Sequence, residues 1–279
     1  MKISIKSIDR AKEGELFHGI FYCLFKENAI TKYGDQFIKL TLRDSTGAID
    51  GKLWENCSYF DQKFEEGDIV AVKALPSIYR NKIILNIQSI DKYAALRHDA
   101  YGFKDNLIPN SKCDSKLLWK ELGCYLRKTG QYSTFIRSIY KKHKDKILEY
   151  PYSPHPELQK EGGYIENLFK ALEVCSSLLK ESDRSDKYDL SLVYTLVFLK
   201  KLSIIACYNK EGVYKIKEEA SLKGEKSIFC NFINEHRSSA EKEDYFLIQK
   251  HINCESSVQK SFEFGLVKRV FEIIDYAAV

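Results

Sequence analysis

The sequence lacks the features that mark membrane-spanning or secreted proteins. It has no run of about eighteen apolar residues, so we expect no transmembrane span. Its charged start, MKISIKSIDRAKEGE, has no apolar core of the kind found in signal peptides. The eight cysteines form no CxxC pair and lie singly, mostly inside apolar runs, as buried cytosolic thiols do. We therefore predict a cytoplasmic protein without a membrane partner.

Familiar catalytic motifs are also missing. The sequence contains no Walker A loop, no GxGxxG and no GxSxG, and HPELQKE is not the zinc-binding HExxH motif. Paired carboxylates such as Glu65-Glu66 have no second acidic cluster at a recognisable spacing, so we interpret them as solvated surface charge. Internal repeats and low-complexity tracts are absent as well. These absences exclude the common nucleotide-dependent and serine-hydrolase classes.

The composition is that of an ordinary globular protein with about two domains. The chain has 279 residues, of which 44% are apolar and 30% charged. The formal net charge is +5 and the pI about 8.6. This excess is compatible with nucleic-acid binding, but dedicated nucleic-acid-binding domains are usually more basic.

The first part of the chain has the pattern of a small β-barrel. Short, partly alternating segments rich in β-branched and aromatic residues are separated by Gly-containing turns such as KYGD and DSTG. Five strands within 100 residues are typical of an OB-fold, a five-stranded, partly open barrel. The predicted strands are 16–25, 36–44, 48–55, 68–75 and 82–90.

Helical periods replace this pattern after about residue 112. Segments with apolar residues three and four apart predict an all-helical second domain. The predicted fold is therefore α+β, with an OB-fold in 1–95, a linker in 96–112 and a helical domain in 113–279. The helices are predicted within 114–130, 132–148, 162–182, 186–208, 222–237, 240–252 and 258–277.

Alternation along the second and third strands assigns the two faces of the barrel. Ile38, Leu40 and Leu42 share one face with Ile49 and Leu53 and predict the core. The opposite face mixes positive charge with large rings, the combination that binds phosphates and stacks on the bases of single strands. A packing role for Trp54 or Phe37 is the alternative. The candidate contacts, with those of two adjoining loops, are Lys32, Tyr33, Phe37, Lys39, Arg43, Lys52, Trp54, Tyr79, Arg80 and Lys82.

Two segments resemble a known family. QFIKLTLRDSTGAIDGKLWE (36–55) is similar to the OB-domain core of the YhaM-type bacterial 3′-5′ exoribonucleases, and YPYSPHPELQKEGGYIENL (150–168) resembles the start of their second domain. The resemblance implies an N-terminal OB-fold followed by a helical HD phosphohydrolase domain. It would make the substrate single-stranded RNA and the cofactor Mn²⁺ or another divalent cation.

The residues that would perform the chemistry depart from that family's pattern. HD domains hold a cation on His and Asp side chains, so that the metal can activate water. Aligned on the Gly162-Gly163 step, Asn167 stands where the family has a histidine, and Lys200-Lys201 stands where it has the His-Asp doublet. A protonated lysine has no lone pair with which to bind a cation. The paired histidines before the Gly-Gly step are likewise replaced, by Glu157 and Leu158.

The resemblance leaves only weak metal candidates, which are His236, His251 and Asp275 with its neighbour Glu272. We therefore predict a catalytically degenerate HD-like domain with no cofactor. Lys200 and Lys201, inside the apolar segment FLKKLSIIA, have three explanations: their ammonium groups reach out to water, they pair with leftover acids such as Glu157, Glu166 or Asp275, or they hold a phosphate.

The favoured function is a protein that binds single-stranded nucleic acid, with RNA as the first candidate, and does not hydrolyse it; the sequence leaves the choice between RNA and DNA open. One alternative is a divergent metal-dependent 3′-5′ exoribonuclease, and another is a scaffold that binds a protein partner or forms a homo-oligomer.

Overall fold

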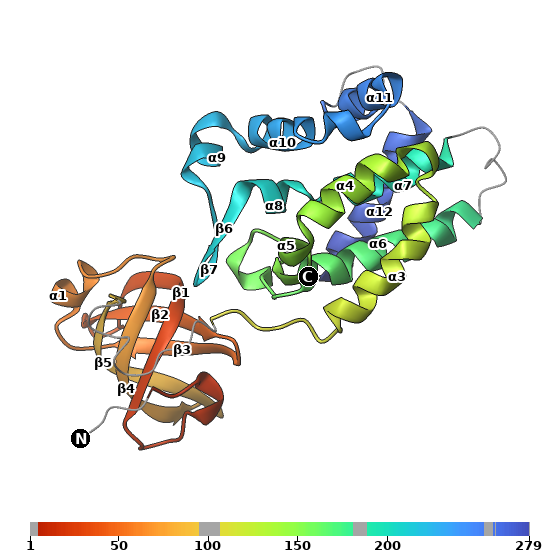
Figure 1. Ribbon diagram of the computed structural model, residues 1–279. Helices are drawn as coiled ribbons and strands as arrows, with labels where there is room; N and C mark the ends of the chain where they lie inside the picture. The colour runs from red at the N-terminus through yellow and green to blue at the C-terminus, as the bar shows by residue number, and fades with distance from the viewer. Residues whose placement is uncertain (1–4, 95–106, 181–188, 254–258, 260, 279) are drawn as a thin grey trace. The chain divides into compact units, whose positions relative to one another are not determined.

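The computed structural model describes residues 5–94, 107–180, 189–253, 259 and 261–278. The chain divides into two compact units, Met1–Pro109 and Asn110–Val279, which are considered separately (Figure 1). Most of the predicted linker, 96–112, lies outside the described residues. At its described end, Leu107 and Ile108 are buried, and Asn110 forms a parallel bridge with Glu161.

The first unit is a closed five-stranded barrel, as predicted. Its strands follow the order β1-β2-β3-β5-β4, with β1 pairing antiparallel to β4 and β3 pairing parallel to β5. A short helix, α1 (Cys57–Asp61), connects β3 to β4. This strand order, with the helix between the third and fourth strands, is that of an OB-fold. The strands are β1 (Phe17–Ile30), β2 (Gln36–Asp44), β3 (Gly47–Leu53), β4 (Ile69–Tyr79) and β5 (Lys82–Lys92).

The predicted inward face is confirmed. Ile38, Leu40 and Leu42 are fully buried on β2, and Leu53 is fully buried on β3. The prediction for Arg43 is wrong, because its side chain is only 7% exposed.

The N-terminal segment contacts the residue next to Arg43. A turn of 3₁₀ helix, η1 (Ile8–Arg10), lies over the end of the β2–β3 hairpin. The Ile8 amide donates to Asp44 Oδ2 at 2.7 Å, and the Asp9 amide donates to Thr46 Oγ1 at 3.2 Å. The alternation rule assumes that one face of the strand stays open, but Arg43 pairs in the strand register with Tyr22 of β1, and both residues are buried.

The second unit is largely helical. Helices α6, α7 and α12 pack against one another at its centre, and α10 lies along α8 (Figure 1). Its longer helices are α3 (Ser115–Arg127), α4 (Ser133–Lys142), α6 (Gly163–Lys180), α7 (Leu190–Leu199), α10 (Glu225–Asn234), α11 (Lys242–Ile252) and α12 (Phe262–Ala278). The shorter ones are α5 (Lys144–Glu149), α8 (Ser203–Cys207) and α9 (Glu218–Lys223), with 3₁₀ turns η3 (Gly130–Tyr132), η4 (Pro156–Leu158) and η6 (Arg237–Ser239).

The predicted helix over 186–208 is broken in the structure. Helix α7 ends at Leu199 and α8 begins at Ser203, so Lys200 and Lys201 lie in a turn and not within a helix. The segment Leu190–Cys207 is apolar enough by composition to cross a membrane, with a mean hydropathy of 1.8. It is, however, 72% buried inside the unit, as the core of a helical domain would be.

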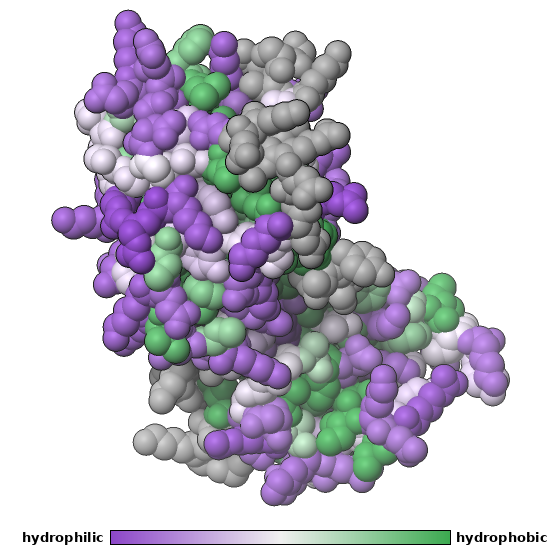
Figure 2. Space-filling model, turned by 90° about the vertical axis from the view of Figure 1, so that its right-hand side faces the viewer, coloured by the Kyte–Doolittle hydropathy of each residue, from purple (hydrophilic) through white to green (hydrophobic). Residues whose placement is uncertain are grey.

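A β-hairpin corrects the expectation of an all-helical second domain. Strands β6 (Tyr208–Glu211) and β7 (Val213–Ile216) pair antiparallel around Gly212, whose φ of 77° suits glycine. Lys210 fixes the hairpin to the helices through ion pairs with Glu149 and Glu161, at 3.2 and 2.5 Å. On the surface, hydrophilic residues cover most of the face shown in Figure 2.

Candidate nucleic-acid interface

Three rings and two cations gather on the outward face of the barrel. The rings of Phe37 and Trp54 stack, with centroids 4.6 Å apart and planes at 27°. The Lys52 ammonium lies 5.6 Å from the Phe37 centroid, 5.4 Å from that of Trp54 and 4.9 Å from that of Tyr79. Arg80 stands over the same Tyr79 ring at 5.3 Å. These five residues are called the aromatic cluster below.

Strand register brings the aromatic cluster together. Ile38 pairs with Leu53 across β2 and β3, so the next outward residues, Phe37 and Trp54, are placed side by side. Lys52 pairs in parallel register with Asn86 of β5, which brings it towards the β4–β5 hairpin that carries Tyr79. The rings remain accessible, since Trp54 is 43% and Tyr79 48% exposed. Stacked rings beside cations that are not buried form the kind of surface on which unpaired bases stack.

The tip of the β4–β5 hairpin holds Arg80 in an unusual conformation. Arg80 and Asn81 have φ values of 50° and 60°, the left-handed region that a two-residue type I′ turn requires. Such φ values are uncommon for residues other than glycine. Lys82 follows as an exposed residue paired with Tyr79 in the strand register. The turn therefore displays two cations beside the Tyr79 ring.

The remaining predicted contacts lie outside the aromatic cluster. Lys39 is exposed on β2, where it forms an ion pair with Glu27 at 3.6 Å and lies 5.3 Å from the ring of Phe25. Lys32 and Tyr33 form a separate cation–π pair at the β1–β2 turn, with centroid distance 4.9 Å and Tyr33 79% exposed. Phe25, 37% exposed on β1, was not among the predicted residues.

A polar cavity borders Phe37 and was also missed. It encloses about 310 Å³ between the β1–β2 hairpin and α1. Its amide side chains, Asn28, Gln36 and Gln62, carry the donors and acceptors that can bind base edges. Lys26, 8% exposed, anchors α1 through Asp61 Oδ1 at 2.9 Å, and this bond lowers the pKa of Asp61. No sequence motif marks the cavity, because its residues come from separate segments.

In the helical unit, Lys201 pairs with an acid that the sequence singled out. Its ammonium lies 3.4 Å from Asp275 Oδ1 and 4.8 Å from the Tyr152 ring centroid. The Tyr152 hydroxyl donates a short hydrogen bond to the same carboxylate oxygen. Burial, and then this bond, raise the pKa of Tyr152 above its ordinary value. One of the three explanations for the lysines, pairing with a leftover acid, thus describes Lys201.

Asn167 lines a cavity of about 270 Å³ together with Glu157, Glu166 and Tyr152. The Asn167 amide donates to the Gly163 carbonyl oxygen at 3.0 Å, one turn back along α6. Glu166 accepts from Lys170 and Ser111, and these bonds lower its pKa although burial acts in the opposite direction. The predicted positions Asn167, Glu157 and Glu166 therefore do meet in one place.

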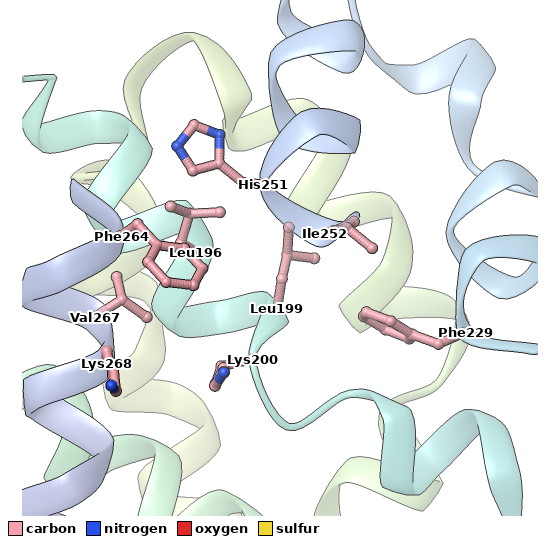
Figure 3. Close-up of a pocket in the computed structure, with 9 residues that line it drawn as sticks. All are labelled: Leu196, Leu199, Lys200, Phe229, His251, Ile252, Phe264, Val267 and Lys268. Carbon is pink, nitrogen blue, oxygen red and sulfur yellow. The ribbon is translucent and has the colours of Figure 1, made fainter. Parts of the chain in front are cut away.

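Lys200 lies elsewhere, at a smaller apolar cavity. This cavity of about 130 Å³ has Leu199, Phe264 and His251 in its wall, with the ends of Lys200 and Lys268 together on one side (Figure 3). Lys200 is exposed, in keeping with the explanation that its ammonium reaches water. Lys200 and Lys201 are adjacent in sequence but lie in different surroundings.

The three weak metal candidates are held by different neighbours. His236 Nδ1 lies 3.0 Å from Ser138 Oγ, His251 Nδ1 donates to the Leu247 carbonyl at 2.9 Å, and Asp275 binds Lys201. Over the described part of the chain, no three His, Cys, Asp or Glu side chains are grouped as a metal site.

The comparisons with known proteins agree with the barrel. A family model described as an OB-fold nucleic acid binding domain matches residues 26–93. A protein named 3′-5′ exoribonuclease YhaM from Halalkalibacterium halodurans is 27% identical over 243 residues, which are 85% of this chain and 73% of that protein. Its namesake from Oceanobacillus iheyensis is 23% identical over 206 residues, 71% of this chain and 64% of its own. The chain is similar to these YhaM-type proteins over most of its length, which supports its assignment to their family.

Among solved structures, the second OB-fold domain of replication protein A from Methanococcus maripaludis is similar to the barrel. It is 22% identical, covers 32% of this chain and 94% of its own, and has a TM-score of 0.27.

At the positions that the resemblance to HD domains singles out, the side chains are poor ligands for a divalent cation. At the predicted ligand positions stand a lysine ammonium paired with Asp275 and an amide bonded to its own helix. An ammonium repels a divalent cation and offers it no lone pair. Only Glu157 and Glu166 supply carboxylate oxygens to the cavity, and Glu166 is already paired with Lys170.

Proposed function

We propose that this chain is a cytoplasmic protein that binds single-stranded RNA through the outward face of its barrel and does not hydrolyse it. The observation that carries the proposal is the aromatic cluster, in which Lys52 lies within 5.6 Å of three ring centroids. Bases can stack on the accessible rings while Lys52, Arg80 and Lys39 neutralise phosphates. Arg43 is left out of the contact set because it is buried.

The proposed lack of hydrolysis rests on chemistry within the helical unit. Lys201 places a positive charge beside Asp275, where the family resemblance puts a metal. A fixed ammonium balances the carboxylate charge without activating water. We propose that this unit has kept the family's fold while losing its metal, and that the protein needs no cofactor.

Binding is tested with a labelled oligouridylate on the full chain at low and moderate salt. We expect the logarithm of the association constant to fall linearly with the logarithm of the salt concentration, with a slope of roughly −0.7 per phosphate neutralised. Lys52→Gln should weaken binding and make the slope shallower. Lys63→Gln is the matched control, because Lys63 also lies over an exposed ring, that of Tyr59 at 4.3 Å, outside the aromatic cluster. Absence of binding at low salt refutes the proposal.

The exoribonuclease alternative is favoured by the names of the two relatives. It is tested by incubating end-labelled single-stranded RNA with the protein and Mn²⁺. We expect intact RNA. A ladder of shortened products that a Lys201→Ala variant no longer makes would establish the enzyme and overturn the second half of the proposal.

A further inference from the structure

The positive charge of this chain is concentrated in one stretch of the helical unit. Residues 115–144, covering α3 and α4, contain eight Lys or Arg residues and one acid, Glu121. Their net charge of +7 exceeds the +5 of the whole chain, so the other 249 residues carry a net charge of −2. An otherwise slightly acidic protein therefore has one strongly basic segment. Such clusters are the electrostatic footprint of a polyanion partner.

A groove lies within this basic segment. It encloses about 510 Å³ between α3 and α4, and its lining is mainly apolar. The half-buried ring of Trp119 faces it together with Tyr140, their centroids 6.4 Å apart and their planes at 25°. Its volume is within the range of roughly 300–1,000 Å³ that small-molecule sites have. The groove can therefore accept flat apolar groups beside an aromatic ring.

Cations without acidic partners surround the groove. Lys120, Arg137 and Lys141 line it, and all three are exposed. The ammonium of Lys144 lies 5.5 Å from the Trp119 ring centroid. Within the described residues none of these four forms an ion pair with Asp or Glu, whereas the neighbouring Lys142 is paired with Glu235 at 2.7 Å. Their charge is available to a ligand.

We propose that the α3–α4 groove is a second contact site for single-stranded nucleic acid, separate from the barrel. Bases enter beside Trp119, and the four free cations neutralise the phosphates on either side. An acidic peptide would share the charge, but only its aromatic residues would offer flat rings to the apolar lining, whereas every nucleotide carries one. The inference extends the proposed function, since the same strand would be bound by both units.

The two tryptophans of the chain allow each site to be observed separately. Trp54 belongs to the aromatic cluster and Trp119 to the groove, and there are no others. A Trp54→Phe variant of the full chain leaves Trp119 as the only indole, and Trp119→Phe leaves Trp54. Each is titrated with an oligouridylate of about 20 nucleotides, longer than the roughly 4–16 that one OB-fold covers. We expect quenching of the indole emission in both variants.

A groove-filling variant tests the place of contact. A Cβ at Gly123 would meet no atom within 4 Å, and Gly123 lines the groove, so Gly123→Phe adds a ring at its wall without changing the charge. Gly265→Phe is the matched control, because Gly265 is also a helical glycine with open space around it. In the Trp54→Phe background, Gly123→Phe should abolish most of the Trp119 quenching, while Gly265→Phe should leave it intact.

The charge is tested by Arg137→Gln combined with Lys141→Gln. Loss of two phosphate contacts should reduce the salt slope for the long oligonucleotide by about 1.4. Circular dichroism of each variant establishes that it is folded.

The outcomes separate this inference from the proposed function. No change at Trp119 while Trp54 is quenched overturns the groove and leaves the barrel. A change at Trp119 alone supports the groove and removes the barrel proposal. Equal quenching of Trp119 by an oligoglutamate of matched charge overturns the assignment to nucleic acid and favours an acidic protein partner.

Discussion

Trp54→Ala should weaken RNA binding far more than it weakens the fold. The substitution removes a ring that is 43% exposed and stacks on Phe37 at 4.6 Å. Stacking of one base on an aromatic side chain contributes about 1–3 kcal/mol, which corresponds to a loss of affinity of roughly 5- to 150-fold. The Phe37–Trp54 contact itself contributes about 0.5–1.5 kcal/mol to the free energy of unfolding.

The two effects are measured independently on the same preparation. Fluorescence anisotropy of a labelled oligouridylate gives the affinity, and urea unfolding gives the free energy of unfolding. Tyr59→Ala is the control, since Tyr59 is a 60% exposed aromatic residue of the same unit that lies outside the aromatic cluster. An affinity within twofold of the wild type for Trp54→Ala, or an equal loss for Tyr59→Ala, would refute the assignment of the site.

Three further predictions concern other parts of the chain. Arg43→Gln should lower the free energy of unfolding by about 1.5–3 kcal/mol and leave RNA affinity unchanged, because Arg43 is buried. Lys39→Gln, at an exposed position of the same strand, should leave the free energy of unfolding unchanged and lower RNA affinity. Urea unfolding and fluorescence anisotropy measure the two quantities, and equal behaviour of the two variants would contradict the prediction. A double-mutant cycle of Lys201→Met and Asp275→Asn should give a coupling of at most about 1 kcal/mol, because the side chains are 29% and 49% exposed; a coupling of several kcal/mol would contradict a partly solvated pair. Burial, and then His236, lower the pKa of His143 to about 4, so the folded state resists protonation, and stability should fall as the pH drops from about 6.5 towards 4. His143→Phe should flatten this fall in urea unfolding at several pH values, and an unchanged pH dependence would show that other groups cause it.

The barrel was largely predictable because its strands alternate strictly where one face is buried. Ile38, Leu40, Leu42, Ile49 and Leu53 all occupy the predicted core. Arg43 could not be placed correctly, since alternation along one strand does not show that Arg43 pairs with the buried Tyr22 of β1. The outward positions of Phe37, Lys52 and Trp54 followed from strand faces, but their meeting with Tyr79 depended on the β3–β5 pairing. The cavity beside Phe37 depended on the position of α1.

The helical unit was less predictable because a buried apolar run has no polar face. Leu192 to Leu199 are all buried, so periodicity could not show that the helix ends there. The β6–β7 hairpin is marked in the sequence by a glycine between YNKE and VYKI. It was not predicted, because the surrounding sequence indicated an all-helical domain. The α3–α4 groove could be suspected from its charge alone, but only the structure shows that Gly123 leaves space beside Trp119.

The order of the strands also determines when the barrel can form during synthesis. Its closing contacts join β1 to β4 and β3 to β5, so the sheet remains open until the last strand has left the ribosome. Gly51 can form its parallel pairing only after Leu85 has been synthesised. Contacts between residues so far apart in sequence form slowly compared with local pairing. Until then the edge of β3 is unpaired, and the edge of β1 is unpaired as long as β4 is missing. Unpaired edges favour pairing with other chains. Arrest of translation within residues 54–80 should therefore expose this chain to aggregation more than arrest after Lys92.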